Sequence, residues 1–218
     1  MTETAETLPP ELQLALAYTP AELRPVLGSA FALDQRLGRI VAATTEPMLG
    51  QMRLAWWRNE LEKDTAQRPQ GDRVLDAVGR HWTGREAALL RMVDGWETLL
   101  TASDLDSAAI RSFGDGRGAF FAELAEATSP ELQTSIRQSA FRWAIADAAA
   151  GVSQAAERER LVAEGLATGA NTLRLPVALR GLAVLDALAR RALERGGRPL
   201  IEGRGASLAA VKAAILRR

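Results

Sequence analysis

The chain has no cysteine and only one histidine, and these shortages exclude several kinds of site. Without cysteine there is no disulfide, no thiolate nucleophile and no cysteine-ligated metal. A histidine-based metal site or a Ser-His-Asp triad would have to use His81, which lies at the expected end of a helix. A partial positive charge is favoured there, and no serine or aspartate constellation surrounds it in the sequence. We therefore expect His81 to be a partly exposed residue without a catalytic role.

The chain also lacks net charge and long apolar runs. Lysine plus arginine and aspartate plus glutamate each number 27, so the formal net charge is zero. A neutral chain has no overall field to attract nucleic acid, and we expect no nucleic-acid partner. No stretch approaches the roughly 20 apolar residues of a membrane span. The acidic start Met1–Glu6 is unlike a signal peptide. We expect a cytoplasmic protein without a transmembrane segment.

β-Branched and aromatic residues are sparse, whereas alanine and leucine dominate, and this balance favours helix over strand. Apolar residues recur every three or four positions, as they do along one face of an α-helix, in the set Leu23, Val26, Ala30, Leu33, Leu37 and Ile40. No strand-like alternation, repeat or heptad run is present. The sequence predicts an all-α protein: a disordered tail over residues 1–9, then a single bundle of about eight to ten helices over residues 10–218.

Threonine and serine beside proline predict several helix starts. Thr19 is expected to cap a helix beginning at Pro20. The run Thr44–Pro47 predicts the start of a helix that reaches about Asp64, and Ser129–Pro130 predicts another start.

Glycine marks the expected ends and interruptions of helices. Gly196–Gly197 predicts a helix stop. The closely spaced Gly114, Gly116 and Gly118 indicate a turn, a kink or a close helix contact. A final helix is expected to carry Leu208, Val211 and Ile215.

One stretch is more specific than composition or periodicity. Residues 46–58 read Glu-Pro-Met-Leu-Gly-Gln-Met-Arg-Leu-Ala-Trp-Trp-Arg. Residues 30–61, of which this run is the strongest part, resemble two consecutive helices of the squalene/phytoene synthase family, in a divergent branch that includes bacterial phytoene synthase-like proteins and a mitochondrial complex I assembly factor. Weaker similarity extends over residues 96–121 and 175–193. The resemblance implies an isoprenoid synthase-like fold.

The family joins two prenyl diphosphates head to head, and ionising the diphosphate requires Mg²⁺ held by carboxylates from two acid-rich motifs on facing helices. By alignment on Glu46–Pro47, the first motif should lie near residues 38–42, where this chain has no carboxylate; Asp34 is the nearest acid. The second motif is reduced to Asp147. Since one or two acids do not hold a cluster of Mg²⁺ ions, we predict no catalytic residue, no metal ligand, no cofactor and no prenyl transfer.

Two residues of the matching run are candidates for a binding cavity. Arg53 facing a cavity could bind phosphate, and Trp57 could line a lipid-shaped space. The alternatives are a solvated Arg53 and a Trp57 packed in the core, with Trp56 at a helix contact. Arg58 and Glu62, four residues apart, are expected to pair on the surface.

Three hypotheses follow. The first is a non-catalytic relative that binds an isoprenoid or other lipid, or a protein partner during respiratory-complex assembly, in the cytoplasm or at the periphery of the inner membrane. The second is an active head-to-head prenyltransferase with an atypical Mg²⁺ site. The third is an unrelated helical interaction module.

Overall fold

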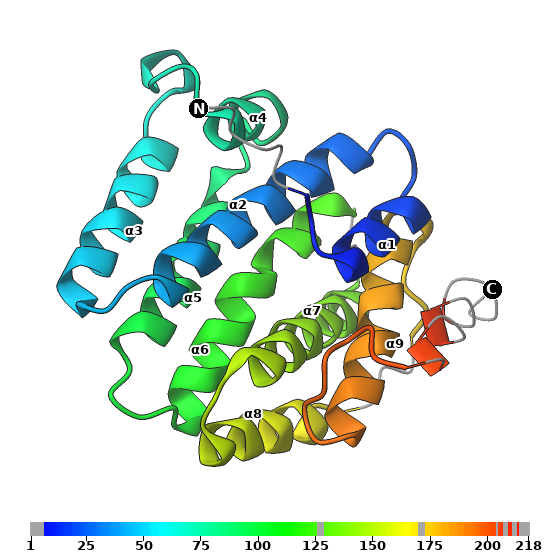
Figure 1. Ribbon diagram of the computed structural model, residues 1–218. Coiled ribbons are helices and arrows are strands. Elements are labelled where there is room, and N and C mark those ends of the chain that lie inside the picture. Colours follow the sequence, from blue (N-terminus) through cyan, green and yellow to red (C-terminus); the bar gives the residue numbers. More distant parts are fainter. Residues whose placement is uncertain are drawn as a thin grey trace.

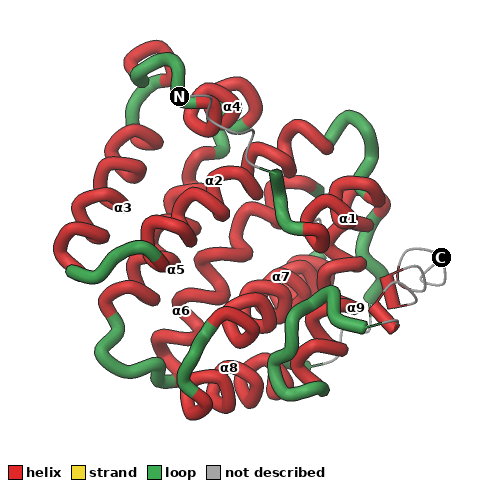
Figure 2. The backbone as a smooth tube through the Cα atoms, viewed as in Figure 1, coloured by secondary structure: helices red, strands yellow, loops and turns green. Residues whose placement is uncertain are grey.

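The computed structural model describes residues 7–125, 129–169, 173–203, 205–206, 209–210 and 213. All regular structure in this part of the chain is helical (Figure 2), so the all-α prediction is confirmed. The α-helices are α1 (Pro10–Tyr18), α2 (Arg24–Ala42), α3 (Pro47–Glu62), α4 (Arg73–His81), α5 (Glu86–Thr101), α6 (Ser107–Gly118), α7 (Pro130–Gly151), α8 (Ala155–Ala167) and α9 (Arg180–Glu194). Residues 1–6 of the expected tail, and Leu208, Val211 and Ile215 of the expected final helix, lie outside the described residues.

Helix α7 occupies the middle of the bundle and packs against α6, α8 and α9 (Figure 1). Helix α5 packs against both α6 and α3, and α3 lies at one edge of the molecule. Helix α1 packs against α9, so two helices that are far apart in the sequence lie in contact. Gly181 allows this close crossing, because a Cβ atom there would lie 2.7 Å from the Ala15 carbonyl oxygen.

Aromatic rings fill the centre where α2 and α7 meet the 3₁₀ turn Ala119–Leu124. The ring of Phe31 lies 6.0 Å from those of Phe120 and Trp143, and Phe121 lies 5.6 Å from Trp143. Most of these pairs meet edge to face or tilted, the arrangements that aromatic quadrupoles favour. The helices are therefore held around an aromatic core.

The cap at Ser129 is confirmed: its Oγ accepts a hydrogen bond of 3.1 Å from the Leu132 amide. The caps predicted at Thr19 and in the Thr44–Pro47 run are wrong. Thr19 and Thr44 both lie after a preceding helix, and their hydroxyls donate to the carbonyl oxygens of Ala15 and Ile40. A threonine hydroxyl can bond backward to the carbonyl four residues earlier as easily as forward to an amide. Helix α3 nevertheless begins at Pro47, as expected, and ends at Glu62.

The three glycines of α6 mark close helix contacts: the helix runs through Gly114 and Gly116 without a turn and ends at Gly118. A Cβ atom on Gly116 would lie 2.6 Å from the Arg91 carbonyl oxygen of α5, and one on Gly118 would lie 2.7 Å from the Ala140 Cβ of α7. The predicted stop at Gly196–Gly197 is confirmed, since α9 ends just before it and both glycines have a φ of +78°. Among the described residues, none of the helices has the length and apolar content needed to cross a bilayer.

Candidate functional site: a buried arginine and an open pocket

Asp34 and Asp147 face each other across the guanidinium of Arg117. Arg117 Nε and Nη2 each lie 2.8 Å from one carboxylate oxygen of Asp34, so this ion pair is bidentate. Arg117 Nη2 also lies 2.7 Å from Asp147 Oδ2, and Nη1 donates to the Ala144 carbonyl. The two acids that the resemblance brought closest to the expected metal motifs thus come together from α2 and α7, and a cation of the protein itself lies between them.

Two indole rings complete the enclosure of Arg117. Its guanidinium carbon lies 4.8 Å from the centre of the Trp96 ring and 4.6 Å from that of Trp143, within the range of a cation–π contact. Trp96 also donates a hydrogen bond of 2.9 Å from Nε1 to Asp34 Oδ1. The side chains of Arg117 and Asp34 are 1% and 0% exposed. We call this group the arginine cluster; it comprises Asp34, Trp96, Arg117, Trp143 and Asp147.

Burial alone would lower the pKa of Arg117, but the charges and hydrogen bonds of Asp34 and Asp147 outweigh it, and the pKa is raised. The arginine is therefore a permanent cation in a place with almost no solvent. Its two neighbours in the sequence, Gly116 and Gly118, explain how it gets there. They bring α6 so close to α5 and α7 that the Arg117 side chain reaches acids on two other helices.

The residues here do not fit the Mg²⁺ cluster that the resemblance implies. Both Asp34 oxygens accept from Arg117, and no group of three or more acidic or histidine side chains in the described part of the chain could hold a metal. A cluster of hard cations needs several free carboxylate oxygens. A divalent cation placed beside the fixed charge of Arg117 would also be repelled.

Arg53 and Trp57 occupy different environments on α3. Trp57 is buried in the core, whereas Arg53 is exposed, and neither lines the pockets described below. The predicted Arg58–Glu62 pair is wrong: Arg58 bonds to Asp94 at 2.6 Å and Glu97 at 2.5 Å, both on α5. Helix α3 packs on α5 along this side, so the α5 acids are within reach of Arg58.

The outer face of α3 carries four exposed apolar side chains: Met48, Leu49, Met52 and Trp56. Met48 and Met52 are 72% and 65% exposed. Trp56 stacks edge to face on the buried Trp57, with ring centres 5.1 Å apart, rather than lying at a contact with another helix. His81 lies in the last turn of α4 and is partly exposed, as expected.

A second buried ion pair joins α7 to α9. Arg142 Nε lies 2.6 Å from Asp186 Oδ1, and Arg190 Nε lies 3.2 Å from the other oxygen of Asp186. Arg142 also donates to the Gly169 carbonyl at 2.8 Å, which fixes the chain that leaves α8. Because Arg142 and Asp186 are buried and bonded to each other and to neighbouring groups, this ion pair serves to hold α7 and α9 together.

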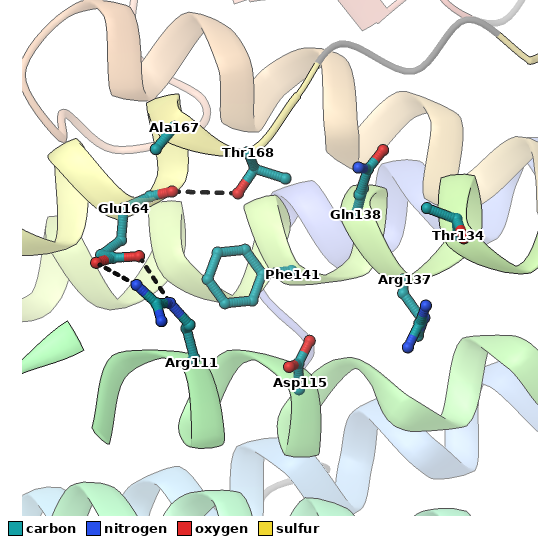
Figure 3. Close-up of a pocket in the computed structure, with 9 residues that line it drawn as sticks. All are labelled: Arg111, Asp115, Thr134, Arg137, Gln138, Phe141, Glu164, Ala167 and Thr168. Atoms are coloured by element: carbon teal, nitrogen blue, oxygen red, sulfur yellow. Dashed lines mark hydrogen bonds and ion pairs between the residues drawn. The ribbon is translucent and has the colours of Figure 1, made fainter. Parts of the chain in front are cut away.

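An open pocket of about 440 Å³ lies between α6, α7 and α8 (Figure 3). Its lining comprises Arg111, Asp115, Thr134, Arg137, Gln138, Phe141, Glu164, Ala167 and Thr168. A smaller pocket of about 180 Å³ lies beside α4, at Thr65, Arg68 and Arg80. The larger one is within the size range of small-molecule sites.

In comparisons with known proteins, no family model, no curated protein and no solved structure matches this chain. The site must therefore be interpreted from its own geometry.

Sequence reasoning singled out Asp34 and Asp147 but missed Arg117 as their partner. The signal was present: an arginine between two glycines, in a helix that otherwise has an apolar face. The pocket had no such signal, because its polar residues come from three helices and are typical of solvated surfaces when considered one at a time.

Proposed function

We propose that this protein is a non-catalytic, squalene/phytoene synthase-like helical protein that acts by binding. The observation that carries the proposal is the arginine cluster, in which Arg117 takes the position between Asp34 and Asp147 that a catalytic relative would need for Mg²⁺. One guanidinium of the chain itself pairs with both carboxylates and offsets part of their charge. It cannot bridge the oxygens of a diphosphate in the way that Mg²⁺ does.

The arginine cluster also supports this role energetically. Truncating one partner of a buried, hydrogen-bonded ion pair leaves an uncompensated charge and costs several kcal/mol. Arg117 pairs with two carboxylates, which share its Nη2 atom, and its guanidinium also contacts two indole rings. Opening this place to a substrate diphosphate would require all of these contacts to break. The arrangement therefore favours a fixed scaffold over a reaction centre.

The outer face of α3 is the surface on which we place the binding function. Its exposed methionines, leucine and tryptophan form a patch of the kind that marks interaction sites. Arg53 is exposed on the same helix and supplies a cation for a phosphate or carboxylate. We propose that this face meets an isoprenoid or other membrane lipid, or a protein partner in respiratory-complex assembly, at the surface of the inner membrane.

Loss of catalysis is tested with purified protein, Mg²⁺ and farnesyl or geranylgeranyl diphosphate. We expect neither diphosphate release nor a head-to-head product by mass spectrometry. A squalene synthase assayed in parallel is the positive control. Any turnover that depends on Asp34 or Asp147 would refute the proposal.

The binding face is tested by flotation with phospholipid vesicles and by photo-crosslinking in membranes of the source organism. A crosslinking residue at Met52 should capture lipid or one defined protein, whereas the same residue at Leu166 of α8, which is also exposed, should not. The double substitution Met52→Gln and Trp56→Gln should abolish flotation, and Trp56→Gln alone should reduce capture in the chain that carries the crosslinking residue at position 52. Equal capture from both positions would show that the α3 face is not special.

A further inference from the structure

The pocket between α6, α7 and α8 has two chemically different halves. In one half the polar groups are already bonded: Arg111 forms a two-point contact with Glu164, at 3.3 and 3.4 Å. Thr168 donates to the Glu164 carbonyl. The Glu164 carboxylate also accepts from Ser107, and the hydrogen bonds from Ser107 and Arg111 lower its pKa. This half ties α6 to α8 and has little capacity left for a ligand.

In the other half, Thr134 donates to the Pro130 carbonyl, but three longer polar side chains have no partner in the described part of the chain. Asp115 of α6 and Arg137 and Gln138 of α7 make no hydrogen bond or ion pair with any described residue. Figure 3 shows the Asp115 carboxylate pointing from α6 toward α7 and the Arg137 side chain pointing back toward α6. A carboxylate that only accepts, a guanidinium that only donates and an amide that does both therefore face one space.

Phe141 supplies an apolar surface beside these groups, on the side of the bonded half (Figure 3). Its ring is fixed by the close approach of α6, since a Cβ atom on Gly114 would lie 2.5 Å from Phe141 Cδ2. The pocket partly removes water from Asp115 and so raises its pKa, whereas Arg137 and Arg111 act in the opposite direction. An opposite charge brought in by a ligand would relieve the cost of this desolvation.

We propose that this pocket binds a small zwitterion, with the anionic group of the ligand on Arg137, its ammonium group on Asp115 and its carbon skeleton on Phe141. The site recognises an ammonium and an anion held a few bonds apart, which a free amino acid or the headgroup of an ethanolamine lipid both provide. The guanidinium can hold a carboxylate or a phosphate in two-point geometry. This inference is independent of the function proposed above, because it uses no residue of the arginine cluster or of α3.

The test uses L-phenylalanine and two analogues that each lack one charge, 3-phenylpropionate and 2-phenylethylamine. Binding is followed by amide chemical shifts of the ¹⁵N-labelled full chain and by titration calorimetry. L-Phenylalanine should bind about tenfold more tightly than either analogue, because each analogue loses one charge-assisted hydrogen bond. O-Phosphoethanolamine is titrated in parallel, and the tighter of the two zwitterions identifies the source of the ligand.

Substitutions at Arg137 and Asp115 test which side chain binds the anionic group of the ligand and which binds its ammonium group. Arg137→Gln should weaken L-phenylalanine by about tenfold and leave 2-phenylethylamine unchanged. Asp115→Asn should weaken it similarly without weakening 3-phenylpropionate. Arg111→Gln, in the bonded half of the same pocket, is the matched control and should change affinity less than about twofold. Since all three positions are exposed, each variant should give the amide spectrum of a folded chain.

Three results would overturn the proposal. One is the absence of shifts at the pocket with either zwitterion at millimolar concentration. Another is equal affinity for 3-phenylpropionate, which would make the pocket a simple anion site. The third is an Arg111→Gln variant that loses as much affinity as Arg137→Gln.

Discussion

Arg117 and Arg137 lie on neighbouring helices, α6 and α7, and the same side chain is used in opposite ways. Arg117 is closed in by two carboxylates and two indole rings. Arg137 is exposed at a pocket and contacts no acid among the described residues closely enough to pair. A saturated, buried cation stabilises the fold, whereas an open one can bind a ligand. The comparison separates the structural part of this protein from the part available for recognition.

The largest loss of stability is expected when Arg117, the fully paired arginine, is replaced. Arg117→Gln should lower the free energy of unfolding by about 3–5 kcal/mol, because it leaves Asp34 buried without a counter-charge. Urea denaturation measures the change. The matched variant Arg137→Gln should stay within about 0.5 kcal/mol of the wild type, as expected for a surface position.

Adding Asp34→Asn to Arg117→Gln sharpens the same comparison. Removing the orphaned charge should recover part of the lost stability, since a neutral pair costs less to bury than a single carboxylate. If the single Arg117→Gln variant loses no more stability than Arg137→Gln, Arg117 does not hold the three helices together.

The next largest loss of stability is expected where α6 approaches α5 closely, beside Arg117. Gly116→Ala should cost about 1–3 kcal/mol through overpacking, because its Cβ would lie 2.6 Å from the backbone oxygen of Arg91 and α5 would have to shift. Gly151→Ala is the control at the end of α7, where a Cβ meets nothing within 4 Å. There we expect a gain of up to about 1 kcal/mol from helix propensity. Thermal unfolding of both variants measures the difference.

A smaller effect arises where α1 approaches the arginine cluster. Burial raises the pKa of Glu11, and the charge of Asp147 adds to this, whereas a backbone hydrogen bond and Arg117 lower it. The folded state therefore holds a proton more tightly than the unfolded state. The contribution of Glu11 to stability is largest below its ordinary pKa and is lost as the pH rises through its raised pKa.

Glu11→Gln should remove that part of the pH dependence. We expect the change between mildly acidic and neutral pH to be less than about 1 kcal/mol, since the side chain is partly solvated. Denaturation at a series of pH values, for both chains, measures the slope. If the slope of stability against pH is the same in both chains, Glu11 does not interact with the arginine cluster.

The smallest effect on stability is expected on the outer face of α3. Met52→Gln should alter the free energy of unfolding by less than about 0.5 kcal/mol, because the side chain is 65% exposed. Denaturation of this variant separates its binding defect from any folding defect.

Much of the helical architecture could be predicted from the sequence, because apolar spacing and proline–glycine punctuation are local signals. Helix starts at Pro47 and Pro130 and the stop at Gly196 follow these signals. The arginine cluster could be predicted only in part. Asp34 and Asp147 stood out, but the pairing of Asp34 with Arg117 joins residues 83 positions apart, and the whole cluster depends on how three helices pack. The predicted caps at Thr19 and Thr44 were wrong because a threonine hydroxyl can bond to a carbonyl at the end of one helix as well as to an amide at the start of the next.

The packing of α1 on α9 has a consequence for how the chain is made. Helix α1 is synthesised before α9, so its main contact surface does not exist until α9 has been made. Until then its apolar side chains have no permanent cover and are open to aggregation or chaperone capture. Closing the long loop between α1 and α9 also carries an entropy cost before their contacts form, which should make the docking of α1 a late event in folding.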